Sequence, residues 1–112
     1  MAVAEPPETP PSPRGAKARV RVHELLRTSA ALDKLGARGI SAQETEQLLR
    51  NRHAIIRNRR DVPSGSDRRL LIGRTDGGRT LTVVIEATID PTTWLIVTGW
   101  LATLRERIIL KD

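Results

Sequence analysis

Arginine side chains are the residues of this chain best suited to chemistry. Guanidinium groups form paired hydrogen bonds to phosphate oxygens, so a cluster of them on one sheet face can hold an RNA backbone. We predict that four bind nucleic acid: Arg38, Arg57, Arg59 and Arg60. Metal-free RNA cleavage, in which the 2′-hydroxyl attacks the neighbouring phosphorus, needs a base, an acid and a cation. The predicted catalytic residues are Arg74, Arg79 and Arg107, with His53 and Glu86 as the two candidate bases.

Each of these residues also has a structural interpretation. His53 stands at an expected helix-to-strand junction, where packing alone explains a histidine. Glu86 is expected to face an arginine across the sheet, which would lower its basicity. Trp94 and Trp100 share a parity on one strand, which predicts packing and leaves base stacking open. Arginine outnumbers lysine sixteen to three, a bias that G+C-rich coding also produces, so a solvated basic face remains an alternative.

Composition excludes several classes of site. Without cysteine there are no disulfides, thiolate metal sites or cysteine nucleophiles. Phosphate-binding glycine loops, G-x-S-x-G elbows and histidine pairs at metal-ligand spacing are also absent, so we expect no cofactor and no metal. The net charge of +6 and the pI near 11.2 favour an anionic partner. Since no apolar run is long enough to span a bilayer, we expect a cytoplasmic protein with no membrane partner.

Residues 69–101 have the pattern of a sheet that would position these side chains. Apolar residues and short turns predict three strands, at 69–75, 81–89 and 94–101. Residues 76–78 tolerate the positive φ of a tight hairpin. One parity of the middle strand predicts a buried face: Leu81, Val83, Ile85, Ala87 and Ile89. The last strand is apolar on both parities and is expected to be central.

Helical spacing and capping signals organise the rest of the chain. Apolar residues at helical spacing predict a first helix over 22–35, ended by Gly36 in the left-handed conformation. Ser41 and Glu44 form a capping-box pattern that begins a second helix, at 41–51. A strand at 53–58 and a surface loop at 61–67 follow. Thr103 and Glu106 repeat the capping box and predict a short terminal helix.

These elements predict an α+β fold with the order ααββββα. Two N-terminal helices would pack on a four-stranded, mainly antiparallel sheet, with a short C-terminal helix after it. Five of the seven prolines fall in residues 1–14, so we predict a disordered proline-rich tail at 1–19. A single domain at 20–112 is expected, with room for one modest aliphatic core.

Four short motifs resemble one known family. They are Gly39-Ile40-Ser41-x-x-Glu44-x-Glu46, Ile72-Gly73-Arg74-Thr75 followed by Gly78-Arg79, Val97-Thr98, and Ala102-Thr103-x-x-Glu106-Arg107. Together with the order of elements, they make residues 22–109 similar to the BrnT-type toxins, small basic ribonucleases of type II toxin–antitoxin modules. The resemblance implies a RelE-like fold. It also implies two partners. One is an antitoxin protein that covers the active face, and the other is RNA, with ribosome-associated mRNA as a candidate.

The chain departs from that family at three points. Arg38 stands where the family usually has the histidine of Lys-His-Gly, and Trp100 stands where it has the arginine of Ser/Thr-Ala-Arg. RelE-like nucleases often use tyrosine, which this chain lacks. Two hypotheses follow: a toxin-like, metal-independent endoribonuclease, or a catalytically inactive basic module that binds nucleic acid or an antitoxin-like protein. A DNA-binding repressor is disfavoured, because the second expected helix begins with acidic residues and leads directly into a strand.

Overall fold

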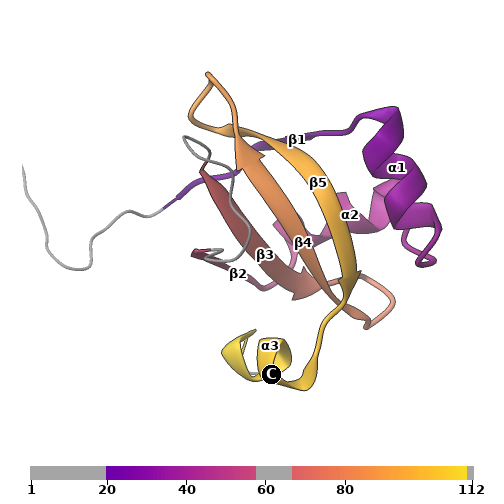
Figure 1. Cartoon of the computed structure of the whole chain (residues 1–112). Helices are drawn as coiled ribbons and strands as arrows, with labels where there is room; N and C mark the ends of the chain where they lie inside the picture. The colour runs from indigo at the N-terminus through magenta and orange to yellow at the C-terminus, as the bar shows by residue number, and fades with distance from the viewer. Residues whose placement is uncertain (1–19, 58–66, 111–112) are drawn as a thin grey trace, which may run out of the picture.

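The computed structural model describes residues 20–57 and 67–110, which form three helices and one five-stranded sheet (Figure 1). The strands are β1 (Glu24–Leu26), β2 (His53–Arg57), β3 (Arg68–Arg74), β4 (Thr80–Ala87) and β5 (Thr93–Leu101). The helices are α1 (Ser29–Gly36), α2 (Ala42–Arg50) and α3 (Leu104–Leu110). The strand order is β1-β5-β4-β3-β2, and only the β1–β5 pair is parallel. The mixed α+β class is confirmed.

The N-terminal part of the predicted first helix is wrong. Residues 24–26 form β1, which pairs with β5 and makes the sheet five-stranded rather than four-stranded. Thr28 explains the late helix start, because its hydroxyl accepts a hydrogen bond from the Ala31 N–H at 3.1 Å. The observed order is therefore βααββββα. The predicted tail at 1–19 and most of the predicted loop at 61–67 lie outside the described residues.

The predicted left-handed end of the first helix lies at Gly39 instead of Gly36. Gly39 has φ 73°. The Ile40 N–H donates to the Leu35 carbonyl and the Gly39 N–H to the Gly36 carbonyl, both at 3.0 Å. This is a Schellman motif, and the buried Leu35 and Ile40 supply its apolar contact. The turn leads directly to Ser41, where α2 begins with the predicted capping box.

Strand β4, not the predicted β5, is the central strand of the sheet. The side of β4 that faces α1 and α2 forms the centre of the core. Leu81, Val83 and Ile85 are fully buried as predicted, with Leu35 and Leu48 of the helices among the residues packed there. The predicted burial of Ile89 is wrong, because β4 ends at Ala87 and Ile89 is fully exposed.

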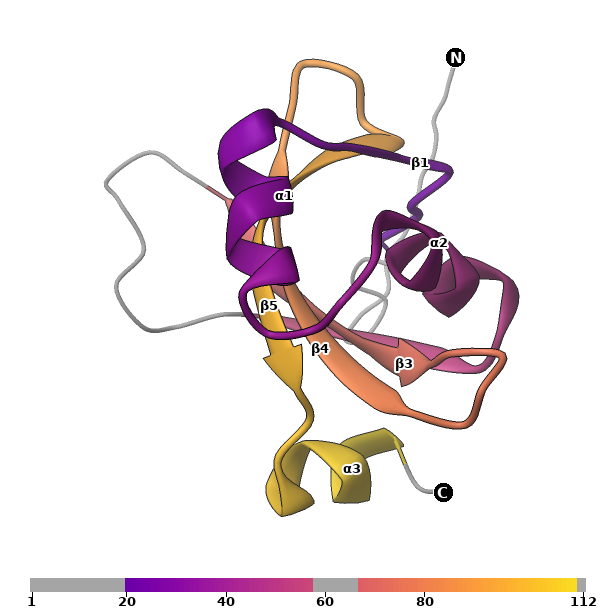
Figure 2. The same cartoon turned by 90° about the vertical axis from the view of Figure 1, so that its right-hand side faces the viewer.

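A bulge explains why the last strand is apolar on both parities. Val84 pairs with Thr98 whereas Ile85 pairs with Ile96, so β5 carries one extra residue and its side chains change faces there. Trp94 accordingly joins the core beneath the helices. Trp100 faces the opposite side, where α3 crosses one end of the sheet (Figure 2). The two tryptophans therefore do not form one stacking surface.

Candidate functional site

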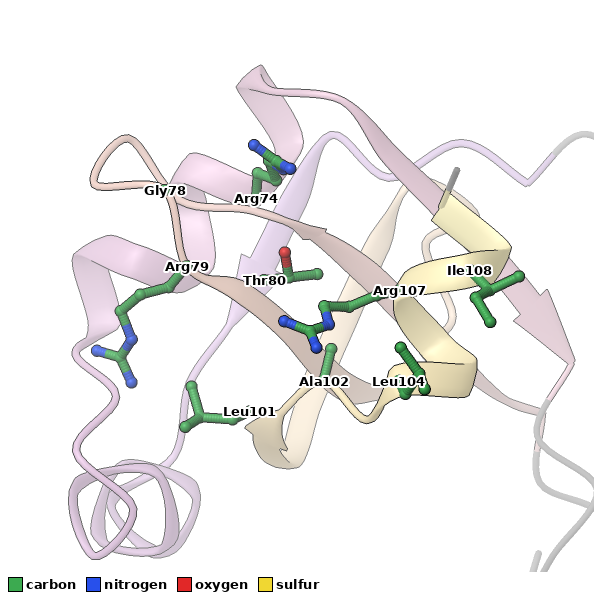
Figure 3. A pocket seen from close by; sticks show the side chains of 9 residues that line it. All are labelled: Arg74, Gly78, Arg79, Thr80, Leu101, Ala102, Leu104, Arg107 and Ile108. Carbon is green, nitrogen blue, oxygen red and sulfur yellow. The ribbon is translucent and has the colours of Figure 1, made fainter. Parts of the chain in front are cut away.

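An open groove lies where β4 begins and β5 ends, between the β3–β4 hairpin and α3. Its volume is about 870 Å³. Basic and aliphatic side chains line it side by side (Figure 3). The residues of the groove are Arg74, Gly78, Arg79, Thr80, Leu101, Ala102, Leu104, Arg107 and Ile108. Two walls thus define the site, a hairpin wall (residues 74–80) and an α3 wall (residues 104–108).

The backbone of the hairpin wall is fixed by a three-residue loop. The Gly78 N–H donates to the Thr75 carbonyl at 3.0 Å, and Gly78 has φ 91°, as the predicted hairpin requires. The buried Thr75 hydroxyl accepts a further hydrogen bond from the Arg79 N–H at 3.0 Å. The loop therefore sets the directions in which Arg74 and Arg79 leave the sheet.

Side chains from the end of α2 clamp this loop. The Asp76 carboxylate accepts hydrogen bonds from Arg50 Nη2 at 2.8 Å and Asn51 Nδ2 at 2.9 Å. Gln47 Oε1 accepts from the Asp76 N–H at 2.9 Å, and Asn51 Nδ2 also donates to the Arg74 carbonyl at 2.9 Å. Several independent bonds thus hold the hairpin wall in place.

The α3 wall is held by the carboxylate of Glu106. Its Oε1 accepts hydrogen bonds from Thr82 Oγ1 at 2.8 Å, Trp100 Nε1 at 3.1 Å and the Thr103 N–H at 2.8 Å. Thr103 and Glu106 form the predicted capping box, completed by the Glu106 N–H bond to Thr103 Oγ1. Burial raises the pKa of Glu106, but these hydrogen bonds outweigh it and hold the pKa below its ordinary value. The carboxylate is therefore a structural anchor and a weak base.

Three of the five predicted catalytic residues line the groove. Figure 3 shows Arg107 reaching from α3 toward β4, with Arg74 at the hairpin rim. Arg79 lines the groove with its stem, but its guanidinium turns away. Its Nη1 donates to the Gly39 carbonyl at 3.0 Å and to Glu44 Oε2 at 3.1 Å. Arg79 therefore ties the hairpin to the α1–α2 turn.

The two candidate bases lie elsewhere. A Cβ added to Gly73 would meet the Cβ atoms of His53 and Leu48 at 3.0 and 3.2 Å, which places His53 on the sheet face that α2 covers. Its Nδ1 lies 2.9 Å from the Asn51 carbonyl. Glu86 faces Arg68 across the sheet, and Arg68 Nε lies 2.7 Å from Glu86 Oε1. This is the cross-strand arginine pair that the sequence analysis gives as the structural interpretation of Glu86.

The predicted nucleic-acid-binding arginines are not brought together by the part of the chain that is described. Arg38 Nη1 donates to the Gly99 carbonyl at 2.9 Å, so the residue at the position of the family's histidine braces β5. Arg57 is exposed at the end of β2. Arg59 and Arg60 lie outside the described residues.

The sequence interpretation missed the aliphatic half of the groove. Leu104 and Ile108 stand four residues apart on α3 and thus share a helix face, a spacing visible in the sequence. The Glu44–Arg79 pair carried no such signal, because its members are 35 residues apart. Within residues 20–57 and 67–110, no three acidic or histidine side chains form a candidate metal site. Over the same residues, no helix has the length and apolarity that crossing a membrane requires.

Comparison with known protein families found no match to this chain, and comparison with curated proteins found none either. The similarity to BrnT-type toxins therefore rests on the motifs themselves. Several motif residues have structural roles in this fold, since Glu44 holds Arg79 and Glu106 holds Trp100.

Proposed function

We propose that this chain is a basic binding module on a BrnT-like toxin scaffold, which holds an anionic macromolecular partner in the groove and does not cleave RNA. The observation that carries the proposal is the separation of the candidate catalytic groups. Arg74 and Arg107 line the groove, whereas His53 faces α2 and Glu86 is paired with an arginine. Neither of the two candidate bases is therefore among the described residues that line the groove with these arginines.

Cleavage of RNA through its 2′-hydroxyl requires a proton acceptor within about 3 Å of that hydroxyl, or one water away. No carboxylate or imidazole is among the described residues that line the groove. Glu106 lies beside it, but its carboxylate already accepts three hydrogen bonds and its pKa is lowered. Two arginines suffice for binding a charged partner, which needs no base.

The motifs support a shared scaffold more strongly than a shared chemistry. Ser41 and Glu44 cap α2, and Thr103 and Glu106 cap α3. These residues shape the two walls of the groove, so their resemblance to a toxin family favours a similar fold. Function depends on the groups in the site, and at two family positions this chain carries Arg38 and Trp100 instead.

A metal-independent endoribonuclease, encoded with an antitoxin, is the second candidate. It is favoured by one observation, that Arg74 and Arg107 line the same groove and match the oxygens of a phosphorane in charge and geometry. Water or a group on the substrate would then have to accept the proton.

Two measurements, one in cells and one on the purified protein, separate these candidates. The chain is induced alone in a bacterial host beside Arg74→Ala, and the purified protein is incubated with labelled single-stranded RNA. We expect no growth arrest and no cleavage by either protein. Growth arrest by the wild type that Arg74→Ala relieves, together with RNA fragments, would establish the ribonuclease instead.

The class of anionic partner is read from salt dependence. If RNA occupies the groove, log Kd changes with log salt with a slope of magnitude about 0.7 per phosphate contact. A slope near zero counts against RNA as the partner.

A further inference from the structure

We infer that the groove docks an acidic, amphipathic segment of a partner protein, with its aliphatic side chains on the α3 wall and a carboxylate on Arg107. The inference rests on the proposed function and names the partner class. It comes from the combination of two surface types, aliphatic and basic, in one groove.

The aliphatic side chains that line the groove are exposed. Leu101, Leu104 and Ile108 are 55%, 67% and 63% exposed, and all three line the groove. Leu104 and Ile108 stand one turn apart on α3, whereas the Leu101 side chain points away from them, with Ala102 and Arg107 in between (Figure 3). Single exposed leucines are ordinary, but Leu104 and Ile108 are neighbours on α3 with Arg107 beside them, which suits a partner that is both apolar and acidic.

The basic part of the groove suits carboxylates. Among the described residues, the acidic side chains near it are already engaged: Glu44 with Arg79, Asp76 with Arg50, and Glu106 within the α3 anchor. They therefore do not neutralise Arg107 at the groove centre. An arginine beside aliphatic surface binds a carboxylate in two parallel hydrogen bonds while apolar neighbours are covered. The net charge of +6 attracts an acidic partner from a distance.

The lining favours a protein segment over RNA. Proteins that bind single-stranded RNA stack bases on aromatic side chains, and no aromatic residue is among the described residues that line the groove. Trp94 is buried in the core, and the Trp100 indole is bonded to Glu106. RNA would gain only phosphate contacts here and would leave Leu104 and Ile108 uncovered.

A second copy of the chain is the competing protein occupant. The β4–β5 turn presents the fully exposed Ile89 next to Asp90, whose pKa is lowered by the Thr92 backbone hydrogen bond. This tip lies at the opposite end of β4 from the groove, so docking it would join copies head to tail. It offers a single aliphatic side chain, whereas an amphipathic helix of a partner offers several at i, i+3 and i+4.

The test uses a displayed library of random 16-residue peptides, panned on the full-length wild-type chain and counter-selected on the Arg107→Gln variant. Recovered peptides are then measured by fluorescence anisotropy against four variants, all at exposed positions. Leu104→Ser and Arg107→Gln change the groove. Their controls, Ile89→Ser and Arg105→Gln, change a fully exposed isoleucine outside the groove and the arginine two residues away on α3.

We expect the selected peptides to be enriched in Asp or Glu beside Leu or Ile. Their affinity should fall about tenfold in Leu104→Ser and in Arg107→Gln, and less than about twofold in both controls. Selection without acidic and aliphatic enrichment, or equal loss in variants and controls, overturns the inference. So does single-stranded RNA that binds the groove with loss in Arg107→Gln and none in Leu104→Ser. Concentration-dependent self-association abolished by Ile89→Ser would assign the groove to a second copy.

Failure of this inference is separable from failure of the proposed function. RNA cleavage or growth arrest by the wild type tests the proposed function and involves no peptide. A chain that neither cleaves RNA nor binds acidic amphipathic peptides would retain the first proposal and lose the second.

Discussion

The two walls of the groove are held in different ways. The hairpin wall is supported by a loop with its own backbone hydrogen bonds and by side chains of α2 that meet at Asp76. The α3 wall follows the last strand, and its polar attachment to the sheet converges on one carboxylate, that of Glu106. Support is distributed in the first wall and concentrated in the second. The hairpin wall should therefore tolerate the loss of one contact, whereas one substitution at Glu106 should detach the α3 wall from the sheet.

This difference matters because the weaker wall carries most of the binding surface. Leu104, Arg107 and Ile108 all belong to α3, a helix of seven residues. So short a helix has little stability of its own and persists through tertiary contacts. Buried Leu110 supplies an apolar contact, and Glu106 supplies the polar one. We expect the order of α3, and with it the shape of the groove, to depend on Glu106.

The largest effect is expected from Glu106→Ala. Three donors lose a charged acceptor, and the buried Thr82 hydroxyl loses its partner, so the free energy of unfolding should fall by about 2–4 kcal/mol. Urea denaturation measures the loss, and amide exchange over residues 104–110 should accelerate. Glu46→Ala is the control, because Glu46 is half exposed and its carboxylate forms an ion pair with Arg27 at the surface. It should cost less than about 1 kcal/mol, and equal losses would remove the distinction between the walls.

The hairpin wall depends on one backbone conformation that its side-chain hydrogen bonds do not stabilise. Gly78 has φ 91°, so Gly78→Ala should cost about 1–2 kcal/mol of stability even though a Cβ there has open space. Gly77→Ala is the matched control, since Gly77 is not among the positive-φ glycines and its added Cβ would lie 3.9 Å from Thr75 Oγ1. Thermal unfolding of the two variants provides the comparison. A similar shift in both would show that the loop does not need its left-handed residue.

Acid should weaken the α3 wall in particular. The folded-state pKa of Glu106 is lowered, so its stabilising contribution is complete above the ordinary value of 4.5 and is lost as the pH falls through the folded pKa. The loss should be smaller than in Glu106→Ala, because a protonated carboxyl still accepts hydrogen bonds. We expect wild-type stability to fall more steeply than that of Glu106→Gln below pH 4.5. Identical slopes in urea titrations at several pH values would contradict this.

Local patterns predicted local structure well. Both capping boxes and the Gly78 hairpin come from residues within four positions of one another, and strands β2 to β5 lie close to their expected bounds. Local patterns did not predict which segments far apart in the sequence pair with each other in the sheet. Residues 24–26 form a strand that pairs with β5, although their apolar spacing suits a helix. The bulge in β5 likewise could not be read from a strand that is apolar on both parities.

The site was predictable in its parts and not in its assembly. Arg74 and Arg107 were identified by residue type, and the structure places both at one groove. Which arginines are engaged elsewhere was decided by contacts between distant segments. Arg38 reaches Gly99, and Arg79 reaches Glu44. A sequence pattern shows which side chains have the right chemistry, whereas tertiary contacts decide which of them are used for structure.

The smallest effect is expected where support is most distributed. Arg50 and Asp76 form an exposed ion pair, and Asn51 and Gln47 still hold Asp76 when Arg50 is removed. Arg50→Ala should therefore lower the free energy of unfolding by less than about 0.5 kcal/mol, measured by urea denaturation. The double variant Arg50→Ala/Asn51→Ala should lose more than the two single changes added together, because each partner compensates for the other. Strict additivity, or a large loss from Arg50→Ala alone, would mean that the hairpin wall depends on single contacts just as the α3 wall does.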